Sequence, residues 1–254
     1  MSTVVTSSIE HLRLQASGYT LRFVQSQADL ERVQRLRFEV FNLELKEGLA
    51  SAYQTGRDAD AWDAVCTHLM VEHDATQQLV GTYRMQTGWT AKDALGYYAA
   101  QAFDMTVFAA ERGQMLELGR ACIAQKHRHF SVLVLLWRGI AAFAQEHGAR
   151  YLVGCSSLTS QSPQDAHDAY NAMQVHLAPQ TFRTLPHPSK ACAPVDRVQC
   201  AHFKLPKLLS TYLSLGAWVC GPAALDAEFK TLDFLTLLDL HAPQMKWQRQ
   251  RFGF

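Results

Sequence analysis

The chain has 254 residues, of which 48% are hydrophobic and 19% charged, and its formal net charge is +1. This composition is typical of a globular protein and excludes a disordered or low-complexity chain. Because the charges nearly balance, no nucleic-acid partner is predicted, and any charge-driven contact needs a local patch. We expect a single domain over residues 1–254, with a core at about 19–240 and a flexible C-terminal tail at 241–254.

The N-terminus lacks the basic start and long apolar core of a secretory signal, so a cytoplasmic location is expected. The longest apolar stretch, at 132–144, is interrupted by Arg138 and is shorter than the roughly 20 residues that cross a bilayer. Six cysteines without a C-x-x-C pair predict reduced, mostly buried thiols.

The first half of the chain alternates strand and helix patterns. Its predicted elements are a strand at 19–25, a helix capped by Asp29, a polar flexible segment at 44–63, strands at 68–73 and 79–86, and a helical insertion near 91–102. Turn-forming residues at 74–78 predict that the two central strands form an antiparallel hairpin.

The second half opens with a strand at 115–123, a helix capped by Ser131 and ended by Gly148, and a strand at 151–155. A strand, helix, strand order predicts parallel pairing. Later elements are a helix at 165–176, a loop at 179–194, and strands at 198–205 and 234–240. The fold class is therefore α/β, with a mixed central sheet and helices on both faces.

Several chemistries have little support in the sequence. Neither G-x-G-x-x-G nor G-x-x-x-x-G-K-[ST] occurs, which argues against Rossmann and P-loop enzymes. No metal site is expected, since three i,i+2 pairs lack further ligands at zinc-finger spacing: Cys66 with His68, His127 with His129, and Cys200 with His202. Cys155 or Ser156 has no G-x-S-x-G elbow around it and is better explained as structural.

The strand at 115–123 carries two charged residues, Glu117 and Arg120, on either side of Gly119. They would face opposite sides of the strand unless a bulge at Gly119 brings them together. One interpretation is a structural ion pair. The other is a carboxylate that takes a proton from an amine nucleophile, with a backbone N–H freed by the bulge to polarise a carbonyl.

A local basic patch follows this strand, formed by Lys126, Arg128 and Arg138 around the helix that is predicted to begin near Ser131. The free N–H groups and positive dipole of a helix start favour an anion such as phosphate. A solvated basic face is the alternative interpretation.

Short motifs in a fixed order carry a family resemblance. They are Arg37-x-x-Val40-Phe41, Asp60-x-Trp62-Asp63, Val80-Gly81-Thr82-Tyr83-Arg84 and Glu117-x-Gly119-Arg120. In this order the chain resembles the GNAT-fold acyltransferases that include acyl-homoserine lactone synthases and N-acyl amino acid synthases. The run at 205–217 and Asp226-x-x-Phe229-x-Thr231-x-Asp233 are similar to the branch that contains the L-ornithine Nα-acyltransferases.

Two departures from related enzymes refine what the resemblance implies. Residues 125–131 are bulky and basic where acetyl-CoA-dependent members have a glycine-rich pyrophosphate loop, which favours carrier-protein thioesters as donors. Gly119 stands where the lactone synthases have serine, which disfavours lactone chemistry.

The resemblance implies roles for individual residues. Glu117 would be the base, with Arg120 beside it in the catalytic set and Arg84 helping to orient Glu117 or a substrate carboxylate. The substrate-binding set would be Arg84, Arg37, Phe41, Asp60 and Asp63, with either aspartate meeting the cationic side chain of ornithine. The acyl-donor set would be Lys126, Arg128, Phe130, Ser131 and Arg138. An acyl tunnel could use Phe38, Phe41, Phe103, Phe108 and Trp137.

The implied function is transfer of a long-chain, 3-hydroxylated acyl group from acyl carrier protein to the α-amine of ornithine. The phosphopantetheine arrives with the donor, so no separate cofactor is expected. A tail containing Lys246, Trp247, Arg249, Arg251, Phe252 and Phe254 could touch the inner membrane peripherally. Alternatives are another acceptor such as glycine, or a non-catalytic lipid- or carrier-binding module, against which the joint presence of Glu117, Arg120 and Arg84 argues.

Overall fold

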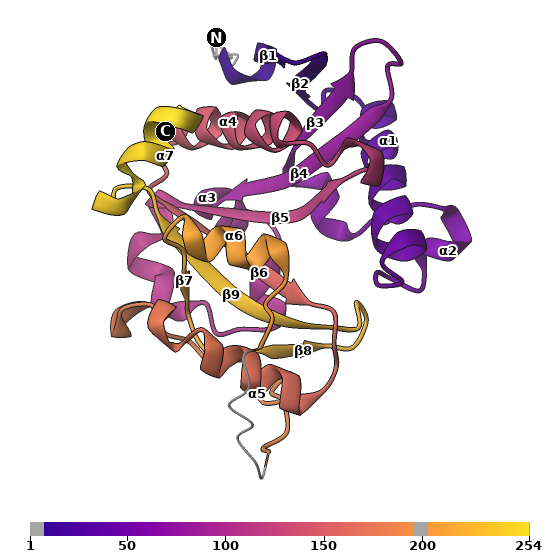
Figure 1. Ribbon diagram of the computed structural model, residues 1–254. Coiled ribbons are helices and arrows are strands. Elements are labelled where there is room, and N and C mark those ends of the chain that lie inside the picture. Colours follow the sequence, from indigo (N-terminus) through magenta and orange to yellow (C-terminus); the bar gives the residue numbers. More distant parts are fainter. Residues whose placement is uncertain (1–7, 196–202, 254) are drawn as a thin grey trace.

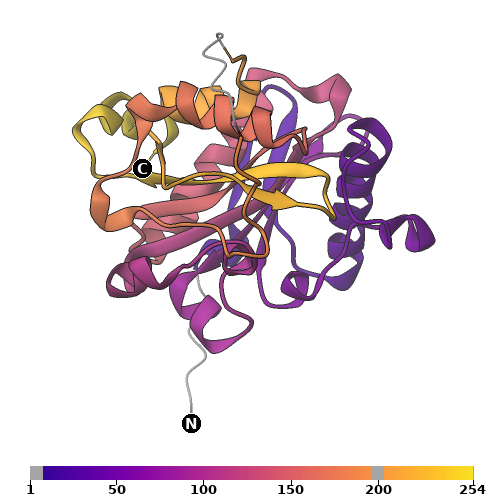
Figure 2. The ribbon, with the colours of Figure 1, turned by 90° about the horizontal axis from the view of Figure 1, so that it is seen from below.

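The computed structural model describes residues 8–195 and 203–253, which form one central sheet with helices on both faces (Figures 1 and 2). The strands are β1 (Arg13–Ala16), β2 (Tyr19–Phe23), β3 (Thr67–His73), β4 (Leu79–Thr87), β5 (Met115–Ile123), β6 (Tyr151–Leu158), β7 (Trp218–Val219), β8 (Ala224–Asp226) and β9 (Thr231–Asp239). The α-helices are α1 (Gln27–Arg37), α2 (Ala52–Thr55), α3 (Gly88–Asp93), α4 (Phe130–Glu146), α5 (Pro163–Ala172), α6 (Lys207–Ser214) and α7 (Lys246–Phe252).

The strand order is β1-β2-β3-β4-β5-β6-β9-β7, with β8 also paired to β9. Neighbouring strands are antiparallel except β5 and β6, which are parallel, as the strand, helix, strand pattern predicted. Helix α4 covers one face of the first half of the sheet, where Leu136 and Ile140 are fully buried. Helix α1 covers the opposite face, where Val33 packs near Met70. The predicted mixed sheet is therefore confirmed.

Both predicted helix caps were wrong. Helix α1 is capped by Ser26, whose Oγ accepts the backbone N–H of Asp29 at 3.1 Å. The Asp29 carboxylate instead accepts two hydrogen bonds from Arg22 on β2. Helix α4 begins at Phe130 after His129, so Ser131 lies within its first turn and caps nothing. Gly148, with φ of +61°, follows its end as predicted.

The segment at 44–63 is ordered, although its polarity predicted flexibility. Helix α2 and a short 3-10 turn at Ala61–Ala64 lie within it. Asp60 and Asp63 form a capping box at the start of that turn, and Asp58 is completely buried. Buried ion pairs with arginines of the sheet and of α1 hold the segment in place, which periodicity in the sequence does not reveal.

The C-terminal segment, expected to be a flexible tail, includes the helix α7 beside α4 (Figure 1). The Phe252 ring is buried and lies 5.8 Å from that of Trp137. Of the predicted tail, Phe254 and the side chains of Trp247 and Arg249 lie outside the described residues. Most of the strand predicted at 198–205 also lies outside them, since only 203–205 are described, and these three residues are not in a strand. Among the described residues, no helix combines the length and apolar character needed to span a bilayer.

Strands β5 and β6 separate partway along their length, and this separation positions the site. They pair only from Met115 with Tyr151 to Glu117 with Val153. Close approach at the branch point requires Gly154, since a Cβ there would lie 2.3 Å from the carbonyl oxygen of Leu118. On its other edge β5 contains one extra residue, because Thr82 faces Cys122 while Arg84 faces Gly119.

The predicted bulge therefore exists, with Arg120 as its left-handed residue, at φ of +50°. A left-handed conformation is costly for a residue with a Cβ, and such residues concentrate at functional sites. The bulge changes the direction of the side chains that follow Glu117, so that Glu117 and Arg120 line one cavity.

Candidate active site

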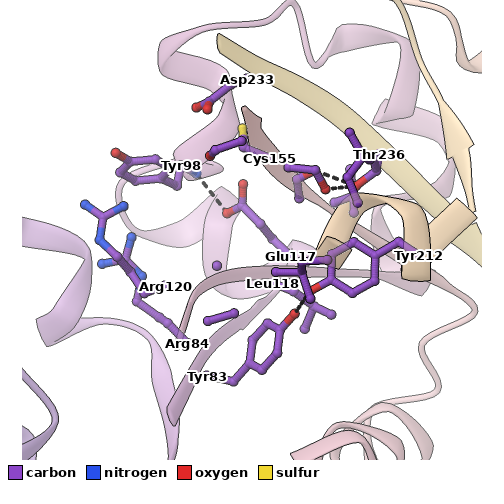
Figure 3. A pocket seen from close by; sticks show the side chains of 18 of the residues that line it. Tyr83, Arg84, Tyr98, Glu117, Leu118, Arg120, Cys155, Tyr212, Asp233 and Thr236 are labelled. Carbon is purple, nitrogen blue, oxygen red and sulfur yellow. Dashed lines mark hydrogen bonds between the residues drawn. The ribbon is translucent and has the colours of Figure 1, made fainter. Parts of the chain in front are cut away.

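A cavity of about 340 Å³ lies where β5 and β6 diverge. Apolar side chains line one part of it, including Trp137, Leu152, Leu209, Tyr212 and Leu238. Charged and polar groups line another part: Glu117, Arg120, Tyr98, Asp226 and Asp233. Figure 3 shows Glu117 between these two parts, with Arg120 and Tyr98 to one side and Tyr212 to the other. A cavity of this composition suits a ligand with a greasy chain and a polar end.

The Glu117 carboxylate is held by three hydrogen bonds. The backbone N–H groups of Tyr98 and Ala99 each donate to it at 2.8 Å, and the side-chain amide of Gln86 also donates to it. Burial raises the pKa of Glu117 above its ordinary value, although these hydrogen bonds oppose that shift. A buried, oriented carboxylate with a raised pKa at a cavity wall has the properties of a general base.

Three arginines and three aspartates form a charge-balanced network beside Glu117. Arg37 is fully buried and pairs with Asp58 at 2.9 Å and with Asp63. Arg84 bridges Asp63 at 2.8 Å and Asp60 at 2.5 Å. Arg120 completes the set by pairing with Asp60 at 2.8 Å and Asp58 at 3.2 Å.

This network brings together four residues predicted as substrate-binding and shows what each contacts. Asp60 and Asp63 already face guanidinium groups, so their negative charge is compensated within the protein. Burial alone would raise the pKa of Asp63, but Arg37 and Arg84 hold it well below its usual range. No hydrogen bond or ion pair joins Glu117 to Arg84 or Arg120 among the described residues, so Gln86 and the backbone orient Glu117 instead.

Arg120 also contacts two aromatic side chains of the cavity. Its guanidinium carbon lies 4.7 Å from the ring centroid of Tyr98 and 4.4 Å from that of Phe229. This stacking, together with the hydrogen bonds that Arg120 donates to Asp58 and Asp60, fixes the plane of its guanidinium at the cavity wall. Arg84 also lies over Tyr98, at 5.1 Å.

The residues predicted to bind the acyl donor lie at the end of β5 and along α4. Lys126, Arg128 and Arg138 are exposed, but Arg128 pairs with Glu44 at 2.6 Å. Phe130 is exposed, and the guanidinium of Arg251 lies 4.4 Å from its ring centroid. The uncompensated positive charge of this patch is thus smaller than the sequence suggested.

Of the five aromatic residues considered for an acyl tunnel, Phe41 and Trp137 line the cavity. Phe103 and Phe108 belong to a separate core cluster with Met115. Phe38 packs instead against Tyr53, with ring centroids 5.4 Å apart. Aromatic residues at helical spacing are most often core, and sequence cannot separate core from tunnel.

Several site residues were not identified from the sequence. Gln86 and Tyr98 contact Glu117, but nothing in their local patterns marks them, since Glu117 recruits them through tertiary contacts. Asp58 belongs to the arginine network and lies near the recognised Asp60 motif. Burial raises the pKa of the Cys155 thiol well above its usual value, which supports its interpretation as structural.

Comparisons with known proteins agree with this geometry. Residues 36–138 match the acetyltransferase (GNAT) domain family. The acyl-homoserine lactone synthase LasI aligns with a TM-score of 0.54 at 13% identity, covering 94% of this chain and 96% of the other. The N-acyl amino acid synthase FeeM aligns with a TM-score of 0.51 at 13% identity, covering 91% and 94%. The fold and the domain match together define a protein of the GNAT fold.

Curated relatives narrow the class. An L-ornithine Nα-acyltransferase of Brucella abortus is 34% identical over 87% of this chain and 84% of its own length. A second, from Rhizobium meliloti, is 32% identical over 86% and 79%. The chain therefore belongs to the L-ornithine Nα-acyltransferase family.

Proposed function

We propose that this enzyme transfers a long-chain acyl group from a carrier-protein thioester to the α-amine of L-ornithine, which forms an N-acylated, lipid-like amino acid. The observation that carries this proposal is the cavity itself. It places the buried Glu117 carboxylate between an apolar compartment and a polar one that contains Arg120. An enzyme that joins a fatty chain to a small zwitterion needs an apolar compartment for the chain on one side of its base and a polar compartment for the amino acid on the other.

In the proposed reaction, Glu117 accepts a proton from the α-ammonium, either directly or through one water. The freed nitrogen lone pair attacks the thioester carbonyl, a C–N bond forms, and the C–S bond breaks to release a thiol that takes up a proton. An α-amine is largely protonated near neutral pH, which is why a base is needed. Arg120 would hold the α-carboxylate of the acceptor so that the nitrogen faces Glu117.

The donor would enter along the diverging edges of β5 and β6. Backbone groups around the bulge at Arg120 are suited to polarise the carbonyl of the thioester. The acyl chain would then extend past Tyr83 towards Trp137 in the apolar compartment. Lys126 and Arg138 on the outer surface would attract the acidic carrier protein. The proposal also includes a 3-hydroxyl group on the acyl chain.

A peripheral contact with the inner membrane is part of this proposal, because an N-acylated amino acid is amphipathic. Arg251 and Phe130, which lie together near the start of α4, would take part in such a contact.

The test is acyl transfer by the purified protein. It would be incubated with long-chain acyl carrier protein and ornithine, lysine, glutamine or glycine in turn, and the products identified by mass spectrometry. The proposal predicts an N-acyl-ornithine amide as the major product. If an amide forms only with glycine or glutamine, that amino acid is the acceptor in place of ornithine. If no amide forms with any of the amino acids, a non-catalytic binding role is favoured.

A further inference from the structure

Four carboxylates line the cavity without forming an ion pair among the described residues, Glu47, Glu117, Asp226 and Asp233, and the last two lie on adjacent strands. Asp226 ends β8 and Asp233 lies on the adjacent β9, and both line the cavity that contains Glu117 and Arg120. Neither takes part in an ion pair among the described residues, whereas Asp58, Asp60 and Asp63 are each paired with arginine. Asp233 is only 7% exposed, so water does little to stabilise its charge.

The neutral partners of these two carboxylates orient them without compensating their charge. One oxygen of Asp226 accepts the backbone N–H groups of Glu228 and Phe229, each at 3.0 Å. Asp233 accepts the hydroxyl of Thr231 at 3.0 Å. Figure 3 shows the Asp233 carboxylate on the same side of the cavity as Tyr98 and beyond Cys155, away from the Tyr83 and Tyr212 pair.

A second, independent feature of the cavity also favours a bound ligand. Gln86 lines it, is 3% exposed, and donates its amide N–H groups to Glu117 and to the carbonyl of Gly96. Its Oε1 is buried and accepts no hydrogen bond from the described residues. An unsatisfied buried acceptor costs free energy, so a bound molecule beside Glu117 that donates a hydrogen bond to this oxygen would bind more favourably.

We propose that Asp226 and Asp233 bind the side-chain ammonium of a diamino acid acceptor, while its α-amine lies at Glu117 and Gln86. This assignment rests on the proposed N-acyltransferase function and adds the feature that selects the acceptor. It replaces Asp60 and Asp63, which the sequence suggested for this role, because arginines already compensate their charge.

The electrostatics of Asp233 agree with this assignment. Burial and the neighbouring charge of Asp226 raise its pKa to about 6, against hydrogen bonds from Ser157 and Thr231. The positive charge of Arg120 opposes this rise in the pKa of Asp233, and burial keeps the Cys155 thiol neutral at ordinary pH. Asp233 is thus mostly ionised at neutral pH, although burial disfavours its charge. A bound ammonium would stabilise the ionised carboxylate.

The experiment compares L-ornithine with L-norvaline, which has the same carbon chain without the ammonium. For wild-type protein and for Asp233→Asn and Asp226→Asn, kcat/KM is measured for both acceptors with the same acyl carrier protein donor. Each variant should lower the ornithine-to-norvaline ratio by roughly tenfold or more, mainly through KM for ornithine. Glu47→Gln, which removes another carboxylate from the same cavity wall, should leave the ratio unchanged.

The outcomes separate this inference from the function on which it rests. An unchanged ratio in both aspartate variants, with ornithine still acylated, would overturn the ammonium subsite and leave the N-acyltransferase intact. A wild-type enzyme that acylates neither acceptor would overturn the proposed function itself. Thermal unfolding of each variant, together with its retained activity on norvaline, distinguishes lost recognition from lost folding.

Discussion

The buried Arg37 allows the most quantitative prediction about stability. Its side chain is fully buried and pairs with Asp58 and Asp63. Replacing it in Arg37→Met keeps much of the side-chain volume but leaves two buried carboxylates with less compensation. Breaking a buried pair from one side costs about 3–5 kcal/mol. For a chain of this length, that cost lowers Tm by about 6–20 °C.

The effect should also depend on pH, in a direction set by Asp63. Arg37 holds the pKa of Asp63 below its usual range in the folded protein. The stability from this pairing is therefore fully present above the unfolded carboxyl pKa of about 3.9, and is lost progressively as the pH falls from there towards the lowered pKa of Asp63 in the folded protein. The difference between wild type and Arg37→Met should be largest near pH 7 and should narrow on acidification.

Calorimetry or circular dichroism at pH 7 and near pH 3.5 would measure this difference. The matched control is Arg35→Met, which removes an exposed arginine of the same helix that pairs with Glu31 only at 3.9 Å. That control should cost less than about 1 kcal/mol. A loss for Arg37→Met no larger than for the control, or one that does not change with pH, would refute the reasoning.

Further predictions concern the cavity, the helix caps and the donor surface. Gly119→Ser should fold normally, since a Cβ at this position meets no atom within 4 Å. The added side chain should narrow the cavity and raise the KM for a substrate, whereas unchanged kinetics would place Gly119 outside the substrate path. Ser26→Ala should cost about 1 kcal/mol in urea unfolding while Ser131→Ala costs far less, and equal costs would argue against the observed caps. Charge reversal of Lys126 with Arg138 should raise KM for acyl carrier protein severalfold without changing KM for ornithine; a parallel rise in both would argue against a docking surface.

Much of the fold follows from local patterns in the sequence. Strand β5 at Met115–Ile123 and the parallel pairing of β5 with β6 were predicted, because alternation, buried helix and glycine stop are local signals. The cap of α1 was misassigned because more than one residue near its start can accept a hydrogen bond, and tertiary pairing decides among them. Asp29, for example, is engaged by Arg22 from a neighbouring strand. The cap of α4 was misassigned because the helix begins at Phe130, after His129, whose side chain makes no capping hydrogen bond.

The site was predictable only in part. The motif around Glu117 and Arg120 marked the right strand, and the bulge was expected from Gly119, although Arg120 adopts the left-handed conformation. The charge compensation of Asp60 and Asp63 was not predictable, since it depends on how far a loop folds back onto β4. Nor does any local pattern show that Gln86 hydrogen-bonds Glu117, because that contact joins adjacent strands.

The most direct test of the central claim is the single-turnover rate of amide formation by Glu117→Gln with ornithine and a long-chain acyl carrier protein. Because Glu117 would accept the proton of the nucleophile, the rate should fall by roughly 100-fold or more, with ornithine binding and thermal stability retained. A rate within about twofold of wild type would contradict the account and remove Glu117 from the role of base.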